Sequence, residues 1–108
     1  MRILKKYFKE FSSDQEEKFE ALFDLYFRWN SRINIISRKD FDNFYERHVL
    51  HSLAISKIFK FNSDDSILDV GTGGGFPGIP LAILIPNTHY YLLDKTKKKI
   101  KVVNSVIK

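Results

Sequence analysis

The chain has 108 residues and a formal net charge of +5 at pH 7, with a hydrophobic share of 44% and a charged share of 29%. This length suits one hydrophobic core, and the composition argues against a disordered tail. Cysteine is absent, which excludes disulfides, thiolate metal sites and cysteine nucleophiles, and fits a reducing compartment.

The N-terminal residues have no long apolar segment, and nowhere is there a run of roughly 20 apolar residues that could span a membrane. We therefore expect a soluble, cytoplasmic protein with no membrane partner. The positive charge permits a polyanionic partner such as nucleic acid, although an excess of lysine is also common on the surfaces of soluble proteins. Charge alone leaves both interpretations open.

A first helix is predicted from Ser13, because Ser13 and Glu16 have the spacing of a capping box. Apolar residues then recur at intervals of three or four, which predicts one buried helix face. We interpret this aromatic face as hydrophobic core and not as a cofactor site. Its members are Phe19, Leu22, Phe23, Tyr26, Trp29 and Ile33.

The periodicity breaks over residues 34–40, and Asp40 can cap a second helix with apolar positions between Phe41 and Ile58. The two helices predict a helical hairpin or small bundle. His48 and His51 lie three residues apart and could share a metal, but no third ligand has suitable spacing. We therefore expect no metal, and interpret both as hydrogen-bonded interface histidines, with packing against the glycine turn as one form.

A polar connector at residues 61–66 separates two kinds of pattern. It divides an N-terminal helical region, residues 1–62, from the first part of an α/β domain, residues 63–108. The second part predicts a buried strand over 67–70, a helix over 77–85, a strand over 88–93 and a helix over 95–107. This β-α-β-α unit predicts the α/β class, with a Rossmann-like but incomplete sheet.

Three alternating glycines, Gly71, Gly73 and Gly75, join the first strand to the next helix. Glycine there permits positive φ and close approach of the backbone to a ligand; a plain tight turn is the alternative. In the dinucleotide pattern G-x-G-x-x-G the third glycine would stand where this chain has Phe76, which disfavours an NAD-dependent oxidoreductase. Asp94 follows Gly71 by 23 residues, near the spacing at which an acid reaches ribose hydroxyls, and also suits a helix N-cap.

The segment Leu68-Asp69-Val70-Gly71-Thr72-Gly73-Gly74-Gly75-Phe76-Pro77-Gly78-Ile79-Pro80 resembles motif I of class I S-adenosylmethionine-dependent methyltransferases. More narrowly, it resembles the bacterial RsmG family, also called GidB, which methylates guanine N7 in small-subunit (16S) ribosomal RNA. The continuation from Phe76 to Leu81 is more specific than the glycines alone. Three other segments are similar to the same family: Trp29-Asn30-x-x-Ile33-Asn34-Ile35, Arg47-His48-Val49-Leu50-His51-Ser52-Leu53 and Leu92-Leu93-Asp94.

This resemblance implies a cofactor, S-adenosyl-L-methionine, and a partner, the ribosomal RNA of the small subunit. It also implies that Asp69 supports the loop and that Asp94 holds the adenosine ribose. Family members often have Asp where this chain has His51, and Ser where it has Lys95. No catalytic residue is assigned, because guanine N7 offers its own lone pair. The implied cofactor-binding residues are Asp69, Gly71, Thr72, Gly73, Gly75, Phe76 and Asp94.

Family members continue well beyond the position that corresponds to Lys108, so we expect this chain to be the front half of the enzyme. A two-stranded parallel sheet cannot bury both faces. We therefore predict that the chain alone neither closes the cofactor site nor catalyses, and that it self-associates through the second-strand edge or the exposed sheet faces. A monodisperse monomer in sedimentation would count against self-association.

Two questions stay open. As an alternative to a methyltransferase, the chain can be a non-catalytic RNA-binding or assembly module whose aromatic helices dock a partner. A lysine-rich segment near the C-terminus can contact RNA phosphates, or it can be the solvated face of the last helix, which is the interpretation we favour. The lysines are Lys95, Lys97, Lys98, Lys99 and Lys101.

Overall fold

The longest element of the computed structural model is α2 (Ser13–Asn30), and its cap differs from the prediction by one residue. Ser12 is the N-cap: its Oγ accepts from the Gln15 amide at 3.1 Å, and Gln15 Oε1 accepts from the Ser12 amide at 3.0 Å. The predicted box of Ser13 and Glu16 is therefore wrong. Gln15 Nε2 also donates to Ile83 O and Leu84 O, and a glutamate, which has no donor, cannot replace it there.

The structure describes residues 1–33, 35–62 and 64–107. Three positions of the sequence predictions lie outside this part: Asn34 in the break after the first helix, Ser63 in the connector, and Lys108. The aromatic face of α2 is confirmed as core, since Phe19 and Tyr26 are fully buried. Helix α1 (Arg2–Tyr7) precedes α2 and contributes the buried Leu4.

Four short helical elements replace the single helix predicted after Asp40. They are α3 (Arg38–Phe41), the π-helical η1 (Tyr45–Leu50), α4 (His51–Leu53) and α5 (Ile55–Ile58). Ser37 and not Asp40 is the N-cap of α3. Asp40 lies in the first turn of α3, where its Oδ1 accepts a hydrogen bond from Arg47 Nη1 at 3.0 Å. Its carboxylate therefore binds a residue of η1 instead of capping α3.

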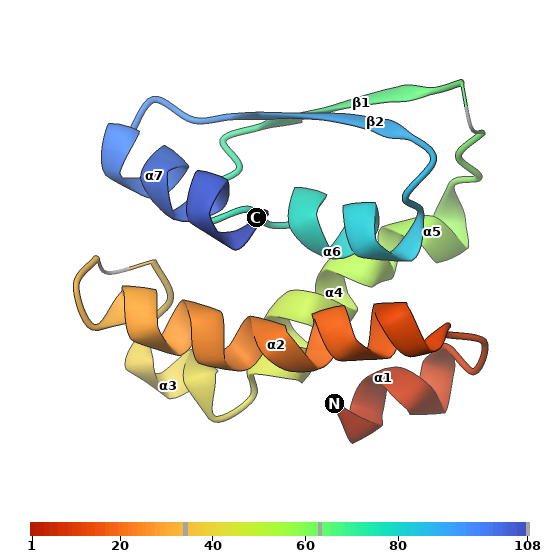
Figure 1. Cartoon of the computed structure of the whole chain (residues 1–108), viewed down its shortest axis with the longest axis horizontal. Coiled ribbons are helices and arrows are strands. Elements are labelled where there is room, and N and C mark those ends of the chain that lie inside the picture. Colours follow the sequence, from red (N-terminus) through yellow and green to blue (C-terminus); the bar gives the residue numbers. More distant parts are fainter. Residues whose placement is uncertain (34, 63, 108) are drawn as a thin grey trace.

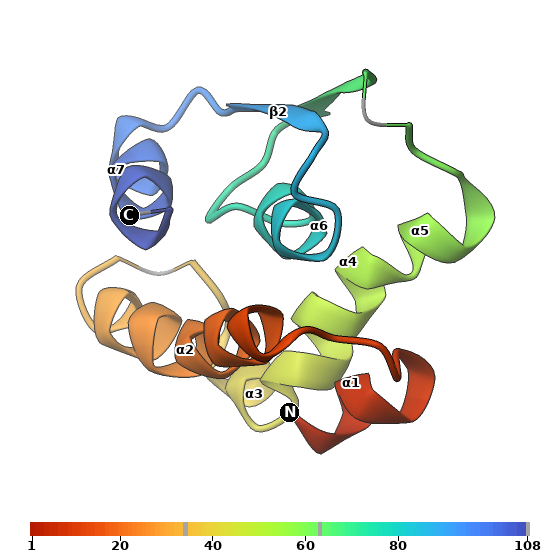
Figure 2. The ribbon, with the colours of Figure 1, turned by 45° about the vertical axis from the view of Figure 1, so that its right-hand side comes forward.

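The α/β part follows the predicted order, with ends within two residues of the expected positions. Strand β1 (Ser66–Val70) leads to α6 (Gly78–Leu84), strand β2 (His89–Leu93) and α7 (Lys97–Val106). The strands are parallel, with Leu68 opposite Tyr91. Figures 1 and 2 show three layers: the sheet, then α6 and α7, then the N-terminal helices.

One face of the sheet is exposed, which corrects the prediction of a buried first strand. Helices α6 and α7 cover the other face only (Figure 2). Because side chains alternate along a strand, every second residue of β1 and β2 lies on the uncovered side. We call this surface the open face. Its residues form three cross-strand pairs, Ser66 with His89, Leu68 with Tyr91 and Val70 with Leu93.

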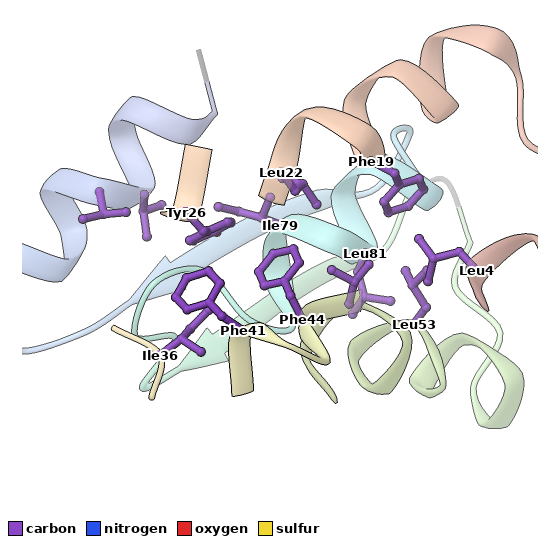
Figure 3. Close-up of a cluster of buried hydrophobic side chains, with 13 residues drawn as sticks. Leu4, Phe19, Leu22, Tyr26, Ile36, Phe41, Phe44, Leu53, Ile79 and Leu81 are labelled. Atoms are coloured by element: carbon purple, nitrogen blue, oxygen red, sulfur yellow. The ribbon is translucent and has the colours of Figure 1, made fainter. Parts of the chain in front are cut away.

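A single cluster of buried side chains joins the helical region to the α/β part (Figure 3). Phe19 and Tyr26 of α2 belong to the same cluster as Ile79 and Leu81 of α6. The glycine turn between β1 and α6 is therefore packed directly against α2. None of the helices in the described part of the chain has the length and apolar character that a membrane crossing requires.

Candidate functional site

The glycine turn, residues 71–77, forms a loop whose backbone requires glycine at three places. Gly71, Gly73 and Gly75 have φ values of 72°, 62° and 116°, and these three are the only described residues with a positive φ. The amides of Gly71 and Thr72 both donate to Leu93 O, at 2.7 and 3.0 Å. The predicted need for positive φ is confirmed, and the loop is fixed to the end of β2.

Asp69 fixes the loop from the covered side of the sheet. Its Oδ2 accepts hydrogen bonds from the Thr72 hydroxyl at 2.7 Å and from the Gly78 amide at 3.0 Å. These two hydrogen bonds connect the loop to the first turn of α6. Asp69 is 9% exposed and Thr72 is 3% exposed. The geometry agrees with the expected supporting role of Asp69 and adds Thr72 and Gly78 as its partners.

Asp94 connects the end of β2 to the loop. Its Oδ2 accepts from the Gly73 amide at 2.9 Å, and its Oδ1 accepts from the Thr96 amide at 2.8 Å. These two N–H groups, first Thr96 and then Gly73, lower the pKa of Asp94, and Lys99 adds attraction. Thr96, and not Asp94, occupies the N-cap position of α7. Each carboxylate oxygen keeps a lone pair for a further donor.

The Gly73 amide is expected to report the titration of Asp94. Because the folded chain lowers the pKa of Asp94, the carboxylate supports the loop fully above the ordinary aspartate pKa of about 3.9. This support is lost as the pH falls through the lower, folded value. The proton shift of the Gly73 amide, followed by NMR, should therefore titrate with a midpoint below about 3.9. A midpoint at or above that value, or the same titration in Asp94→Asn, would contradict this account.

The inner side of the loop rests on α2 and on the segment after it. Tyr26 Oη donates to Gly74 O at 2.6 Å, in a buried position. A Cβ on Gly74 would overlap the side chain of Ile35, and one on Gly75 would overlap Ile79. Asn30 Oδ1 accepts from the Ile35 amide at 2.8 Å and holds that segment in place. Sequence reasoning treated Tyr26 only as core, because no local pattern signals a partner 48 residues away.

Tyr26→Phe is expected to lower the free energy of unfolding by about 1–2 kcal/mol, because the buried Gly74 carbonyl loses its donor. Burial raises the pKa of Tyr26 far above its usual value, so the hydroxyl stays protonated at neutral pH. Urea unfolding measures the change. Tyr7→Phe is the matched control, since Tyr7 is 53% exposed. Equal stability of the two variants would show that the Tyr26 bond does not hold the loop.

Phe76 points away from the outer side of the loop and packs among the helices. Its ring centroid lies 4.9 Å from that of Tyr26 and 5.5 Å from that of His48. Burial lowers the pKa of His48, whose Nε2 lies 3.5 Å from Asp40 Oδ2. Packing of His48 against the glycine turn is thus present. The predicted hydrogen bond is not, because the buried His48 Nε2 has no hydrogen-bond partner among the described residues, and His51 is exposed. A cavity of about 270 Å³ lies between α4 and the loop, lined by Arg47, His48, His51, Ser52, Ile55, Phe76 and Pro77.

The outer side of the loop is open. A Cβ on Gly71 or Gly73 would meet no atom within 4 Å, so a ligand can approach the backbone there. Asp94 stands at the same place through its bond to Gly73. The lysine-rich segment begins directly after Asp94, and four of its five members are exposed: Lys95, Lys97, Lys98 and Lys101. Contact of these lysines with RNA stays the untested alternative to the solvated helix face that we favour.

The described residues hold no group of three or more acidic or histidine side chains arranged to bind a metal ion. The predicted site residues other than Phe76 lie together at the C-terminal ends of β1 and β2. They form a carboxylate-braced glycine loop with one buried and one open side, which is an arrangement that can hold a nucleoside through its ribose.

Comparison with known proteins identifies relatives over nearly the whole chain. The family model GidB, described as rRNA small subunit methyltransferase G, matches residues 15–108. A Bacteroides fragilis protein named ribosomal RNA small subunit methyltransferase G is 54% identical over 106 residues, which are 98% of this chain and 52% of the relative. A Cytophaga hutchinsonii protein of the same name is 58% identical, over 98% of this chain and 51% of the relative. The chain thus spans about half the length of these curated relatives.

Proposed function

The chain belongs to the family of ribosomal RNA small subunit methyltransferase G, and on that premise we propose that it forms the cofactor-loop half of an S-adenosylmethionine-dependent enzyme that methylates guanine N7 in 16S ribosomal RNA. The proposed fold of the complete enzyme is the Rossmann-like fold of class I methyltransferases. The proposal divides the chain into a helical region, residues 1–62, and the start of the α/β domain, residues 63–108.

The observation that carries this proposal is the bond between Asp94 and the Gly73 amide. It places a carboxylate with free lone pairs beside a stretch of backbone that has no side chain. A ribose diol can donate to that carboxylate while the rest of the nucleoside lies against Gly71 and Gly73. The residues present therefore fit the adenosine part of S-adenosylmethionine. The proposed contacts on the open side are Gly71, Gly73 and Asp94, while Asp69, Thr72, Gly75 and Phe76 hold the loop in shape from its buried side.

S-adenosylmethionine supplies an electrophilic methyl group, which guanine N7 can accept through its lone pair without losing a proton. The chain's residues therefore need to bind and orient, and none is assigned a proton-transfer role. Asp69 holds the loop from inside, Asp94 braces it at β2, and Tyr26 fixes its inner carbonyl. Rate enhancement is expected to come from alignment and electrostatics.

Methyl transfer is the direct test of this function. The chain can be fused to the half of the Bacteroides fragilis relative that it does not match, and incubated with 16S RNA and S-adenosylmethionine. Mass spectrometry of the digested RNA should then detect 7-methylguanosine. The unfused chain is the control, and we expect it to be inactive. Cofactor-independent RNA binding by the fusion, without any methylated nucleoside, would favour the alternative of an RNA-binding or assembly module.

A further inference from the structure

A groove of about 370 Å³ lies where the C-terminal end of α2 faces α7, which Figures 1 and 2 show stacked one above the other. The volume is near the lower end of the range of about 300–1,000 Å³ that is usual for small-ligand pockets. The groove therefore suits a group of about the size of one nucleotide. Its lining residues are Leu25, Arg28, Trp29, Ser31, Arg32 and Ser105.

The groove has an apolar and aromatic part. Leu25 and Trp29 are four residues apart on α2 and therefore lie on one helix face. Trp29 is half-buried, so part of its ring forms the surface of the groove. Its Nε1 donates to Ser105 Oγ at 3.3 Å, which fixes the edge of the indole against α7. A planar group can stack on such a ring whichever base it carries.

Two arginines give the groove a positive charge. Arg28 and Arg32 are also four residues apart, and both are exposed. No acidic residue lines the groove, and no described carboxylate forms an ion pair with either arginine. Arg28 Nε donates to Asp24 O at 3.4 Å, which uses one of its five donors. Arg28 also stabilises the C-terminal dipole of α2, but Arg32 lies beyond the last residue of that helix.

We propose that this groove binds one unpaired nucleotide of RNA, with the base against Trp29 and the neighbouring phosphates against Arg28 and Arg32. The inference rests on the proposed function, which makes RNA the substrate class. Guanidinium groups match the geometry of phosphate oxygens, and unpaired bases stack on aromatic rings. The Ser105 hydroxyl accepts from Trp29 and keeps its own proton to donate to the nucleotide.

The groove is connected to the glycine loop through the segment that follows α2. Arg32 precedes Ile35 by three residues, and the side chain of Ile35 lies against Gly74. None of the loop residues lines the groove itself. The groove is therefore expected to hold a nucleotide that flanks the target guanine, while the target itself meets the open side of the loop.

Trp29 is the only tryptophan of the chain, so its fluorescence reports on this groove and not on RNA bound elsewhere. The 108-residue chain is titrated with a short single-stranded RNA at low salt, and saturable quenching is expected. Arg28→Ala combined with Arg32→Ala should weaken the apparent affinity about tenfold. It should also reduce the slope of log K against log salt by about 1.4, because each phosphate contact on a single strand contributes about 0.7.

Arg2→Ala combined with Lys60→Ala is the matched control, because it removes the same charge from exposed residues outside the groove. Polyglutamate is the second control, because it is a polyanion without bases and should leave Trp29 unquenched. Circular dichroism shows whether the variants fold, which is expected because the changed side chains are exposed.

Absence of quenching by RNA, equal loss of affinity in the two double variants, or equal quenching by polyglutamate would overturn the inference. Methyl transfer by the fusion without any RNA-dependent change in Trp29 fluorescence would also overturn it, and would leave the proposed function standing. Quenching that depends on Arg28 and Arg32, together with a fusion that transfers no methyl group, would support the groove and refute the proposed function.

Discussion

Replacement of Asp69 by alanine is expected to lower the free energy of unfolding by about 3 kcal/mol. The Asp69 carboxylate accepts from the Thr72 hydroxyl and from the Gly78 amide, and all three groups are buried. Alanine leaves both donors without an acceptor, and each unsatisfied buried donor costs about 1–3 kcal/mol. Asp69→Asn should cost less, because its amide oxygen can still accept one of the two bonds.

Urea unfolding followed by circular dichroism measures this effect. Asp24→Ala is the matched control, because Asp24 is exposed in the middle of α2, and it should change stability by less than about 0.5 kcal/mol. A loss of about 3 kcal/mol is a large share of the stability of a small domain. If Asp69→Ala were as stable as Asp24→Ala, the loop would not depend on the carboxylate, and the account of its bracing would be wrong.

Asp94→Ala, made in the fusion to the unmatched half of the relative, is expected to weaken S-adenosylmethionine binding about 100-fold. The variant loses the proposed acceptor for the ribose hydroxyls, and hydrogen bonds to a charged acceptor are stronger than those to a neutral one. It also loses the tie to Gly73. Asp64→Ala is the control, because Asp64 is an exposed carboxylate before β1.

A cofactor analogue separates ribose binding from support of the loop. S-adenosylhomocysteine and an analogue without the two ribose hydroxyls are titrated into the wild-type fusion and into Asp94→Ala. If Asp94 accepts from the ribose, the wild type should prefer the natural compound, and the variant should bind both compounds equally. An unchanged preference in the variant would limit Asp94 to a structural role at Gly73 and Thr96.

The elements of the α/β part could be predicted because strong local signals mark them. Gly71, Gly73 and Gly75 identify the loop, since only glycine readily adopts their backbone conformations. The aromatic face of α2 was likewise predictable from its period. The spacing of Asp94 from Gly71 predicts a ribose-binding acid, which stays a prediction, and its hydrogen bond to Gly73 is seen only in the structure. The sequence therefore predicts mainly those features that depend on residues close together in the chain.

The features that sequence reasoning missed depend on contacts between distant segments. Ser12 and Ser13 are each followed three residues later by a residue that can complete a capping box. The box of Ser12 and Gln15 is the one that forms, and in it Gln15 also donates hydrogen bonds to carbonyls at the end of α6. Asp40 was expected to cap a helix, but Arg47 holds its carboxylate. The role of Tyr26 arises only when α2 packs against the loop. Which side of β1 is exposed depends on the helices that pack around it, and the residues of the strand alone do not determine this.

Calorimetry of cofactor binding tests the central claim, that the carboxylate-braced glycine loop holds S-adenosylmethionine. The fusion of this chain to the unmatched half of the Bacteroides fragilis relative is titrated with S-adenosylmethionine and, separately, with NAD. We expect micromolar or tighter binding of S-adenosylmethionine, no measurable heat with NAD, and weak or no binding of either compound by the 108-residue chain alone. Binding of NAD in place of S-adenosylmethionine would contradict the account.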